Sequence, residues 1–160
     1  MQAVSAIQFT APKNVIEALE IIGGKIEEVV AGTGILFTYG GVYYVASPSE
    51  DQSYLCVVFP KFSDMSGFPS LAAANEAIHE INARMKLARV WIDHGQLHAS
   101  SETILDPGMQ LDRVLNRLLK TLQAIVLEAR VRERMPHAQD KHLEPDNLID
   151  QISERTVAIH

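Results

Sequence analysis

Cysteine is nearly absent from this sequence, with Cys56 as the single thiol among 160 residues. One cysteine cannot form a disulfide within the chain, so the fold has to be stable without one. This usage is typical of a reducing compartment, and we therefore expect a cytoplasmic protein. A chain of this length can bury a hydrophobic core without disulfides or a structural metal.

Long apolar runs and an excess of positive charge are also missing. No stretch approaches 18 uninterrupted apolar residues, so we expect no membrane-spanning helix. The first twelve residues, MQAVSAIQFTAP, lack the basic start and the long apolar core of a signal peptide, so none is expected. The net charge of −6 and the pI near 5.5 disfavour nonspecific binding to nucleic acid or to an anionic membrane.

Motifs for catalysis or cofactor binding are absent as well. Cys56 lies between Leu55 and Val57, an apolar setting that predicts a buried thiol and not an activated nucleophile. The glycines form no phosphate-binding pattern between a strand and a helix, so we interpret them as turn residues. We therefore expect no catalytic residues, no bound cofactor and no enzymatic activity.

The six histidines raise the question of a metal site. His94 and His98 flank an expected strand turn, but this spacing along strands separates same-face positions by about 13 Å. His137 and His142 lie in the C-terminal segment, and no cysteine or carboxylate cluster completes a tetrahedral set. We therefore expect no metal site.

What the sequence does contain is a clear order of helical and strand patterns from residue 10 to residue 135. Apolar residues recur at helical spacing in three segments and follow strand patterns in five shorter ones. The helices are expected at residues 11–22, 71–85 and 109–134, and the strands at 35–39, 42–47, 54–59, 87–92 and 97–103. This order, α-β-β-β-α-β-β-α, predicts one α+β domain with an antiparallel sheet packed with helices.

Turn and cap residues mark several borders of these elements. Gly40-Gly41 predicts a two-residue hairpin turn, and Asp93-His94-Gly95 predicts the turn between the last two strands. Thr10 is a candidate N-cap for the first helix, with Pro12 in its first turn. A loop is expected over residues 60–69, and Ser70 is a candidate N-cap for the helix that follows it.

The third helix carries an apolar seam at alternating steps of four and three residues. With its flanking apolar residues the seam spans an arc of about 140°, which favours a helix lying across a sheet. The seam consists of Leu111, Leu115, Leu118, Leu122, Ile125 and Ala129. The strand at 54–59 is apolar in both alternating sets, so both of its faces are expected to be covered, by helices, by a partner subunit or by both.

Beyond Pro136 the sequence becomes polar and acidic. Five acidic residues stand against two basic ones between residues 136 and 160. We interpret this segment as a tail outside the domain that is disordered or loosely docked.

Two segments carry a resemblance to known proteins. They are ANEAIHEINARMKLARVWIDHGQLHAS, residues 74–100, and more weakly GILFTYGGVYYVAS, residues 34–47. Together with the element order over residues 11–131, they resemble the YbjN family of bacterial proteins and the type III secretion chaperone-like (Tir chaperone-like) fold. The resemblance implies a small, acidic, cytoplasmic protein, often a homodimer, that binds proteins without turnover. Chaperones of this fold wrap extended segments of a client around sheet and helix surfaces.

The best candidate for a binding surface is the alternating set Leu87, Arg89 and Trp91 of the fourth expected strand. Tryptophan and arginine are enriched at the energetic centres of protein interfaces. This set therefore predicts contact with a client protein or with a second subunit, although packing of Trp91 in the core is the third alternative. Cations on the polar face of the third helix alternate with Asp112, Glu128 and Glu133, which indicates a solvated face and not a track for nucleic acid.

Overall fold

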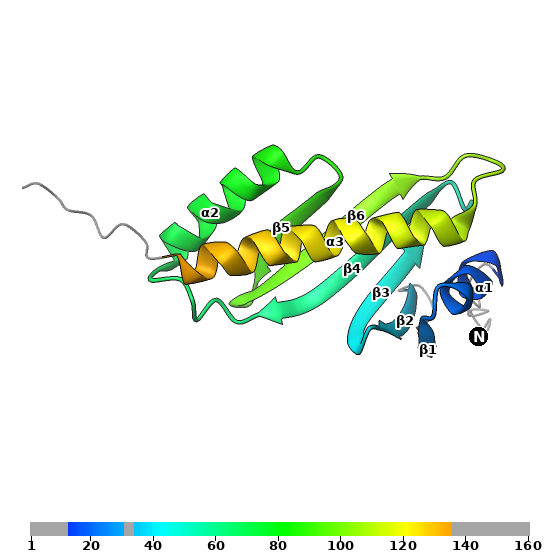
Figure 1. Cartoon of the computed structure of the whole chain (residues 1–160), viewed down its shortest axis with the longest axis horizontal. Helices are drawn as coiled ribbons and strands as arrows, with labels where there is room; N and C mark the ends of the chain where they lie inside the picture. The colour runs from blue at the N-terminus through cyan, green and yellow to red at the C-terminus, as the bar shows by residue number, and fades with distance from the viewer. Residues whose placement is uncertain (1–12, 31–33, 136–160) are drawn as a thin grey trace, which may run out of the picture.

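The computed structural model describes residues 13–30 and 34–135, which form a sheet with three helices (Figure 1). The expected cap at Thr10 and Pro12 and the C-terminal tail lie outside these described residues. The elements in chain order are α1 (Lys13–Ile21), β1 (Lys25–Val30), β2 (Gly34–Tyr39), β3 (Val42–Pro48), β4 (Tyr54–Ser63), α2 (Leu71–Arg84), β5 (Ala88–Asp93), β6 (Gln96–Ile104) and α3 (Leu111–Arg134).

The six strands form one antiparallel sheet in the order β1-β2-β3-β4-β6-β5. The expected α+β class and its helix-packed antiparallel sheet are confirmed. The structure adds one strand, β1, which the expected order of elements does not include. Its alternation is interrupted at Glu27, where a bulge shifts the register between Ile26 and Glu28. Charged residues and a bulge are typical of an edge strand that must not pair with other chains.

Strand β4 continues beyond Phe59, where the sequence predicts a loop. The register shifts between Phe59 and Ser63, and Lys61 has a φ of 51° within this irregular stretch. A proline cannot donate a ladder hydrogen bond, but a bulge tolerates it. Pro60 therefore marks an irregularity in β4, and the strand ends only at Ser63.

The two expected hairpin turns and the expected helix cap are confirmed. Gly40 and Gly41 have φ values of 59° and 78°, and His94 and Gly95 have values of 46° and 73°. Positive φ at both central positions is the mark of a type I′ turn, which matches the twist of the flanking strands. At the start of α2, the Ser70 hydroxyl accepts a hydrogen bond from the backbone N–H of Ala73 at 3.1 Å.

Helix α3 lies along one face of the sheet and contacts both other helices (Figure 1). It also packs on β4, β5 and β6, while α1 packs on β1 and α2 packs on β5. Its seam residues from Leu115 to Ala129 are buried, as expected for a helix lying across a sheet. Within the described residues no helix is both long and apolar enough to span a membrane.

The three helices therefore cover one face of the sheet. Leu55 and Val57 of β4 point to this side and are fully buried, whereas Cys56 and Val58 on the other side are only partly buried. One face of β4 is thus covered by helices, as expected. Cover for its second face by a partner subunit remains a prediction.

We expect the α3 seam to dominate stability. Leu122→Ala removes a side chain with no exposed surface and should lower the free energy of unfolding by about 2–5 kcal/mol, because it leaves a cavity. Leu71→Ala is the matched control, since Leu71 is 58% exposed, and should change it by less than about 0.5 kcal/mol. Urea unfolding measures both, and equal losses in the two variants would contradict the assignment of the core.

Candidate functional site

The face of the sheet opposite the helices, here called the open face, is the most distinctive surface of the molecule. The strand register places one row of side chains across five strands: Leu36, Val45, Val58, Ser100 and Arg89. Residues paired directly across antiparallel strands share a face, so these side chains form one continuous surface. The neighbouring positions on this face are Thr38, Tyr43, Ser47, Tyr54, Cys56, Trp91, His98 and Glu102.

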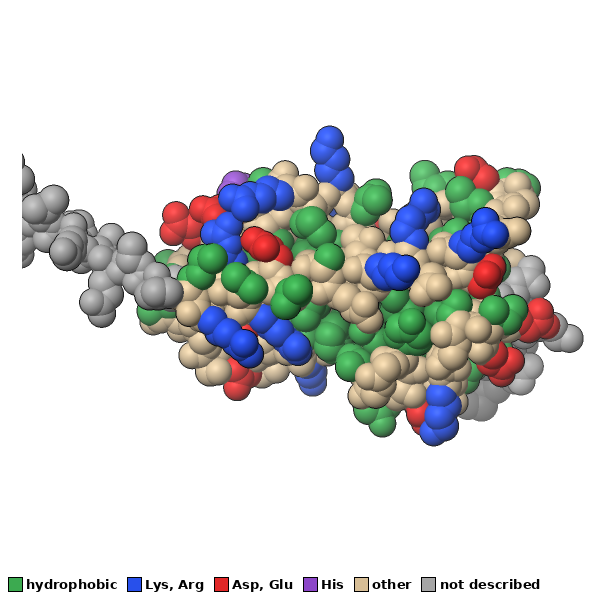
Figure 2. All heavy atoms as spheres, in the orientation of Figure 1, with side chains coloured by type: hydrophobic (Ala, Val, Ile, Leu, Met, Phe, Trp, Pro, Cys, Tyr) green, Lys and Arg blue, Asp and Glu red, His purple; other side chains and the backbone are tan. Residues whose placement is uncertain are grey.

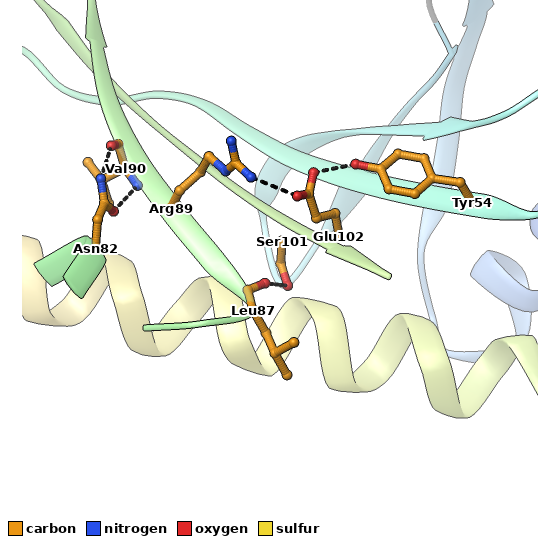
Figure 3. Close-up of polar contacts among 7 residues, drawn as sticks. All are labelled: Tyr54, Asn82, Leu87, Arg89, Val90, Ser101 and Glu102. Carbon is orange, nitrogen blue, oxygen red and sulfur yellow. Dashed lines mark hydrogen bonds and ion pairs between the residues drawn. The ribbon is translucent and has the colours of Figure 1, made fainter. Parts of the chain in front are cut away.

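A polar network joins three strands on the open face (Figure 3). Arg89 of β5 donates from Nη2 to Glu102 Oε1 of β6 at 2.8 Å, and Tyr54 of β4 donates from Oη to Glu102 Oε2. An exposed ion pair adds little stability. Its effect here is to neutralise the charge of the open face and to hold the arginine in one orientation.

The network changes the acid–base behaviour of Tyr54. Burial is the largest cause of its raised pKa, and the hydrogen bond to Glu102 also stabilises the protonated phenol. Tyr54 therefore acts as a fixed donor to Glu102 at neutral pH. An activated tyrosine base would require the opposite shift of its pKa.

Trp91 lies flat beside a histidine on the open face. Its indole ring stacks on the ring of His98, with centroids 5.4 Å apart and an angle of 17° between the planes. The Nε2 atom of His98 is buried and has no hydrogen-bond partner among the described residues. Because Trp91 points away from the helix-covered face, it does not pack beneath any of the three helices.

The structure places Arg89 and Trp91 on the same face of β5, whereas Leu87 lies outside the strand. Leu87 precedes β5, is 58% exposed, and points away from the Arg89–Glu102 pair (Figure 3). Its carbonyl oxygen accepts a hydrogen bond from the Ser101 hydroxyl at 2.8 Å, which ties the start of β5 to β6. Leu87 thus contributes to this region mainly through its backbone.

An asparagine from α2 protects the free edge of β5. Asn82 Nδ2 donates to the carbonyl oxygen of Val90 at 2.9 Å, and its Oδ1 accepts from the N–H of Val90 at 2.8 Å (Figure 3). The side-chain amide thereby replaces a neighbouring strand at this position and hinders strand addition there. Sequence reasoning did not assign this role. The available signal was an amide side chain beside the buried stripe of α2, four residues after Ile78.

Cys56 is poorly suited to nucleophilic chemistry. Burial is the largest cause of its raised pKa, and the negative charge of Glu102 raises it further. A thiol with a raised pKa is protonated at neutral pH and reacts slowly. Throughout residues 13–30 and 34–135, no group of three or more His, Cys, Asp or Glu side chains is placed to hold a metal ion. His137 and His142 lie outside those residues.

Comparisons with known proteins add a structural neighbour and no family. No family model matches the chain, and no curated protein matches it. The crystal structure of an uncharacterized protein from Methanothermobacter thermautotrophicus matches with a TM-score of 0.57 at 14% sequence identity. The match covers 76% of this chain and 95% of that one, and at this identity it supports the fold alone. Membership of the YbjN family therefore stays a prediction.

Removal of the Asn82 amide should weaken the edge of the sheet. Asn82→Ala leaves the N–H and C=O of Val90 without their partner, so we expect a loss of about 1–3 kcal/mol in unfolding free energy. Amide hydrogen exchange at Val90 should become faster. Asn75→Ala, at an exposed position of the same helix, should change neither quantity, and protection of Val90 that survives in Asn82→Ala would refute the role.

The Tyr54–Glu102 hydrogen bond should give the protein a specific alkaline sensitivity. Because folding raises the pKa of Tyr54, its contribution is fully present below the ordinary pKa of 10.0 and is lost as the pH rises above it. The stability advantage of wild type over Tyr54→Phe, measured by urea unfolding between pH 8 and pH 11.5, should shrink across this range. Tyr43→Phe, on the same face, serves as the control, and a constant difference between wild type and Tyr54→Phe would argue against the bond.

Proposed function

We propose that this chain is a non-catalytic protein-binding module and that its open face contacts a partner protein. The observation that carries the proposal is the apolar row Leu36, Val45 and Val58 on β2, β3 and β4, which is partly buried and which no described helix covers. Burial of such a surface against a partner removes apolar area from water, which is the main driving force of association.

The chemistry of the open face supports a protein partner. Its six strands span roughly 24 Å, a width in the range of protein interfaces. Trp91 supplies a flat aromatic surface, and Arg89 supplies a guanidinium group held by Glu102. Because that arginine is paired with a carboxylate, it is not the kind of free positive charge on which nucleic-acid binding depends.

The mode of binding follows from the edges of the sheet. Asn82 occupies the backbone groups of Val90 on β5, and β1 at the other edge carries a bulge beside Glu27 and Glu28. Both features oppose the addition of a partner strand. Contact through side chains of the open face is therefore favoured over strand addition at β5. The resemblance to YbjN proteins and secretion chaperones supports a cytoplasmic module that binds a client segment in this way.

A regulatory or structural homodimer is the second candidate. The specific observation in its favour is that the open face carries both Arg89 and its partner Glu102. A two-fold interface brings the same patch of both subunits together, so a patch with both signs of charge can complement itself. In this alternative the second copy is the partner and no unfolded client is needed.

The proposal is tested by placing a charge on the open face. Val58→Arg introduces a cation into the apolar row, while Ile21→Arg places the same residue at a position on α1 that is 73% exposed. Light scattering of the purified proteins reports the mass relative to the 17.7 kDa chain, and crosslinked pull-down from native lysate with mass spectrometry reports other partners. Trp91→Ala gives a second and milder change on the same face.

We expect wild type to form a dimer or to enrich one dominant partner, and Val58→Arg to reduce that association at least tenfold. Trp91→Ala should weaken it less, and Ile21→Arg should leave it unchanged. A dimer without an enriched partner would favour the homodimer candidate. Association that is equal in wild type, Val58→Arg and Trp91→Ala would refute the proposed use of the open face, provided that circular dichroism shows all variants to be folded.

A further inference from the structure

The side of α3 that faces away from the sheet carries a second heptad pattern, here called the outer stripe. All of its members are exposed, and they repeat at alternating steps of four and three residues: Arg113, Arg117, Lys120, Ala124, Leu127, Val131 and Arg134. Figure 2 shows Lys and Arg side chains at intervals along this helix, beside a hydrophobic surface. The spacing places these side chains along one side of the helix, like the buried seam on the opposite side.

The first half of the outer stripe is cationic and unpaired. The side chains of Arg113, Arg117 and Lys120 form no ion pair or hydrogen bond with any described residue. They line a shallow groove of about 570 Å³ together with Met85, Asn116, Thr121 and Ala124. A second groove of about 390 Å³ also includes Arg113 and Arg117. The three cations therefore concentrate positive charge along this groove, beside the apolar side chains of Met85 and Ala124.

α3 carries three carboxylates, and Asp112 in its first turn forms no ion pair with these cations among the described residues. Glu128 accepts a hydrogen bond from Arg132 at 3.4 Å, and Glu133 accepts one from the Ser63 hydroxyl. Both carboxylates are thus engaged near the C-terminal end of the helix. The unpaired cations Arg113, Arg117 and Lys120 thus lie in the N-terminal half of α3, where Asp112 is the one carboxylate of the helix.

The second half of the outer stripe carries apolar side chains before it ends at Arg134. Leu127 is 63% exposed and Val131 is 41% exposed, and they lie one turn apart on the same side of α3. A partner for the whole stripe should therefore offer carboxylates to Arg113, Arg117 and Lys120 and apolar side chains to Leu127 and Val131. Nucleic acid offers no apolar side chains for the latter pair.

Residues 136–160 of the same chain have this chemistry. They follow α3 directly and contain five acidic and two basic residues, together with Leu143, Leu148, Ile149 and Ile152. Along the segment Leu143 precedes four of the five carboxylates, and when the stripe is followed back from Met135 its apolar side chains likewise precede its three unpaired cations. We propose that residues 136–160 bind the outer stripe of α3 in their own copy of the chain, with their carboxylates on Arg113, Arg117 and Lys120.

The length of the segment is sufficient. From Arg134 back to Lys120 the helix spans about 21 Å, at about 1.5 Å per residue. Ten extended residues reach about 33 Å, so a carboxylate at Glu144 or beyond can meet Lys120. A tether this short also gives the segment a high effective concentration at the stripe, which favours it over a separate acidic chain.

Paramagnetic relaxation in the full-length chain tests the proposal. A nitroxide is attached through Ser153→Cys in a Cys56→Ser background, and amide intensities are compared before and after reduction of the label. We expect amides of residues 113–124 to lose about half of their intensity or more, while amides of β2 and β3 keep theirs. The loss should diminish as salt is added, because exposed charges are screened.

Two variants with the same change in net charge make the test specific. Arg117→Glu/Lys120→Glu should abolish the intensity loss on α3, whereas Lys25→Glu/Lys61→Glu, at exposed positions away from the stripe, should preserve it. An unchanged α3 spectrum in the labelled protein overturns the proposal, as does an equal response of the two variants. Broadening that appears only when isotope-labelled and spin-labelled copies are mixed also overturns it, because the segment then binds a second copy or another acidic surface.

Discussion

Burial of the α3 seam against the sheet is the constraint on which the rest of the structure depends. The seam runs along the 24-residue helix α3, and its members Leu115, Leu122 and Ile125 are completely buried. Because α1 and α2 also pack against α3, all three helices gather on the same face of the sheet. The open face exists for this reason. Since the helices cover one side of the strands, no described element covers the other side.

The edge of the sheet is controlled by the same arrangement. Packing of α2 beside α3 and β5 brings Asn82 to the backbone of Val90, where its amide group meets both the N–H and the C=O. A helix side chain thereby satisfies an edge strand that would otherwise present free backbone groups. One face of the sheet is thus uncovered by helices, whereas its β5 edge is protected at Val90.

The molecule presents two surfaces with different chemistry on opposite sides. On the open face, Arg89 is paired with Glu102, so apolar and aromatic side chains determine what can bind. On the outer stripe, Arg113 and Arg117 lack partners among the described residues, so electrostatic attraction contributes much more. Binding to the open face should therefore depend weakly on salt, and binding to the outer stripe should depend on it strongly.

The sequence by itself determined the features that depend on local periodicity and local backbone conformation. The heptad spacing of α3, the glycine turn at Gly40-Gly41 and the cap at Ser70 are all encoded within a few residues, because helix geometry and positive φ are local properties. The alternation around Val90 likewise predicted that Arg89 and Trp91 share a face.

Only the tertiary structure decided the features that depend on residues far apart in the chain. Both alternating sets of β4 are apolar, so the sequence alone left open which set faces the helices, and packing of α3 placed Leu55 and Val57 there. The contact of Arg89 with Glu102 depends on strand register, and that of Asn82 with Val90 depends on the position of α2. The bulges in β1 and β4 shift such registers by one or more residues, and a register is a property of two strands that lie apart in the chain.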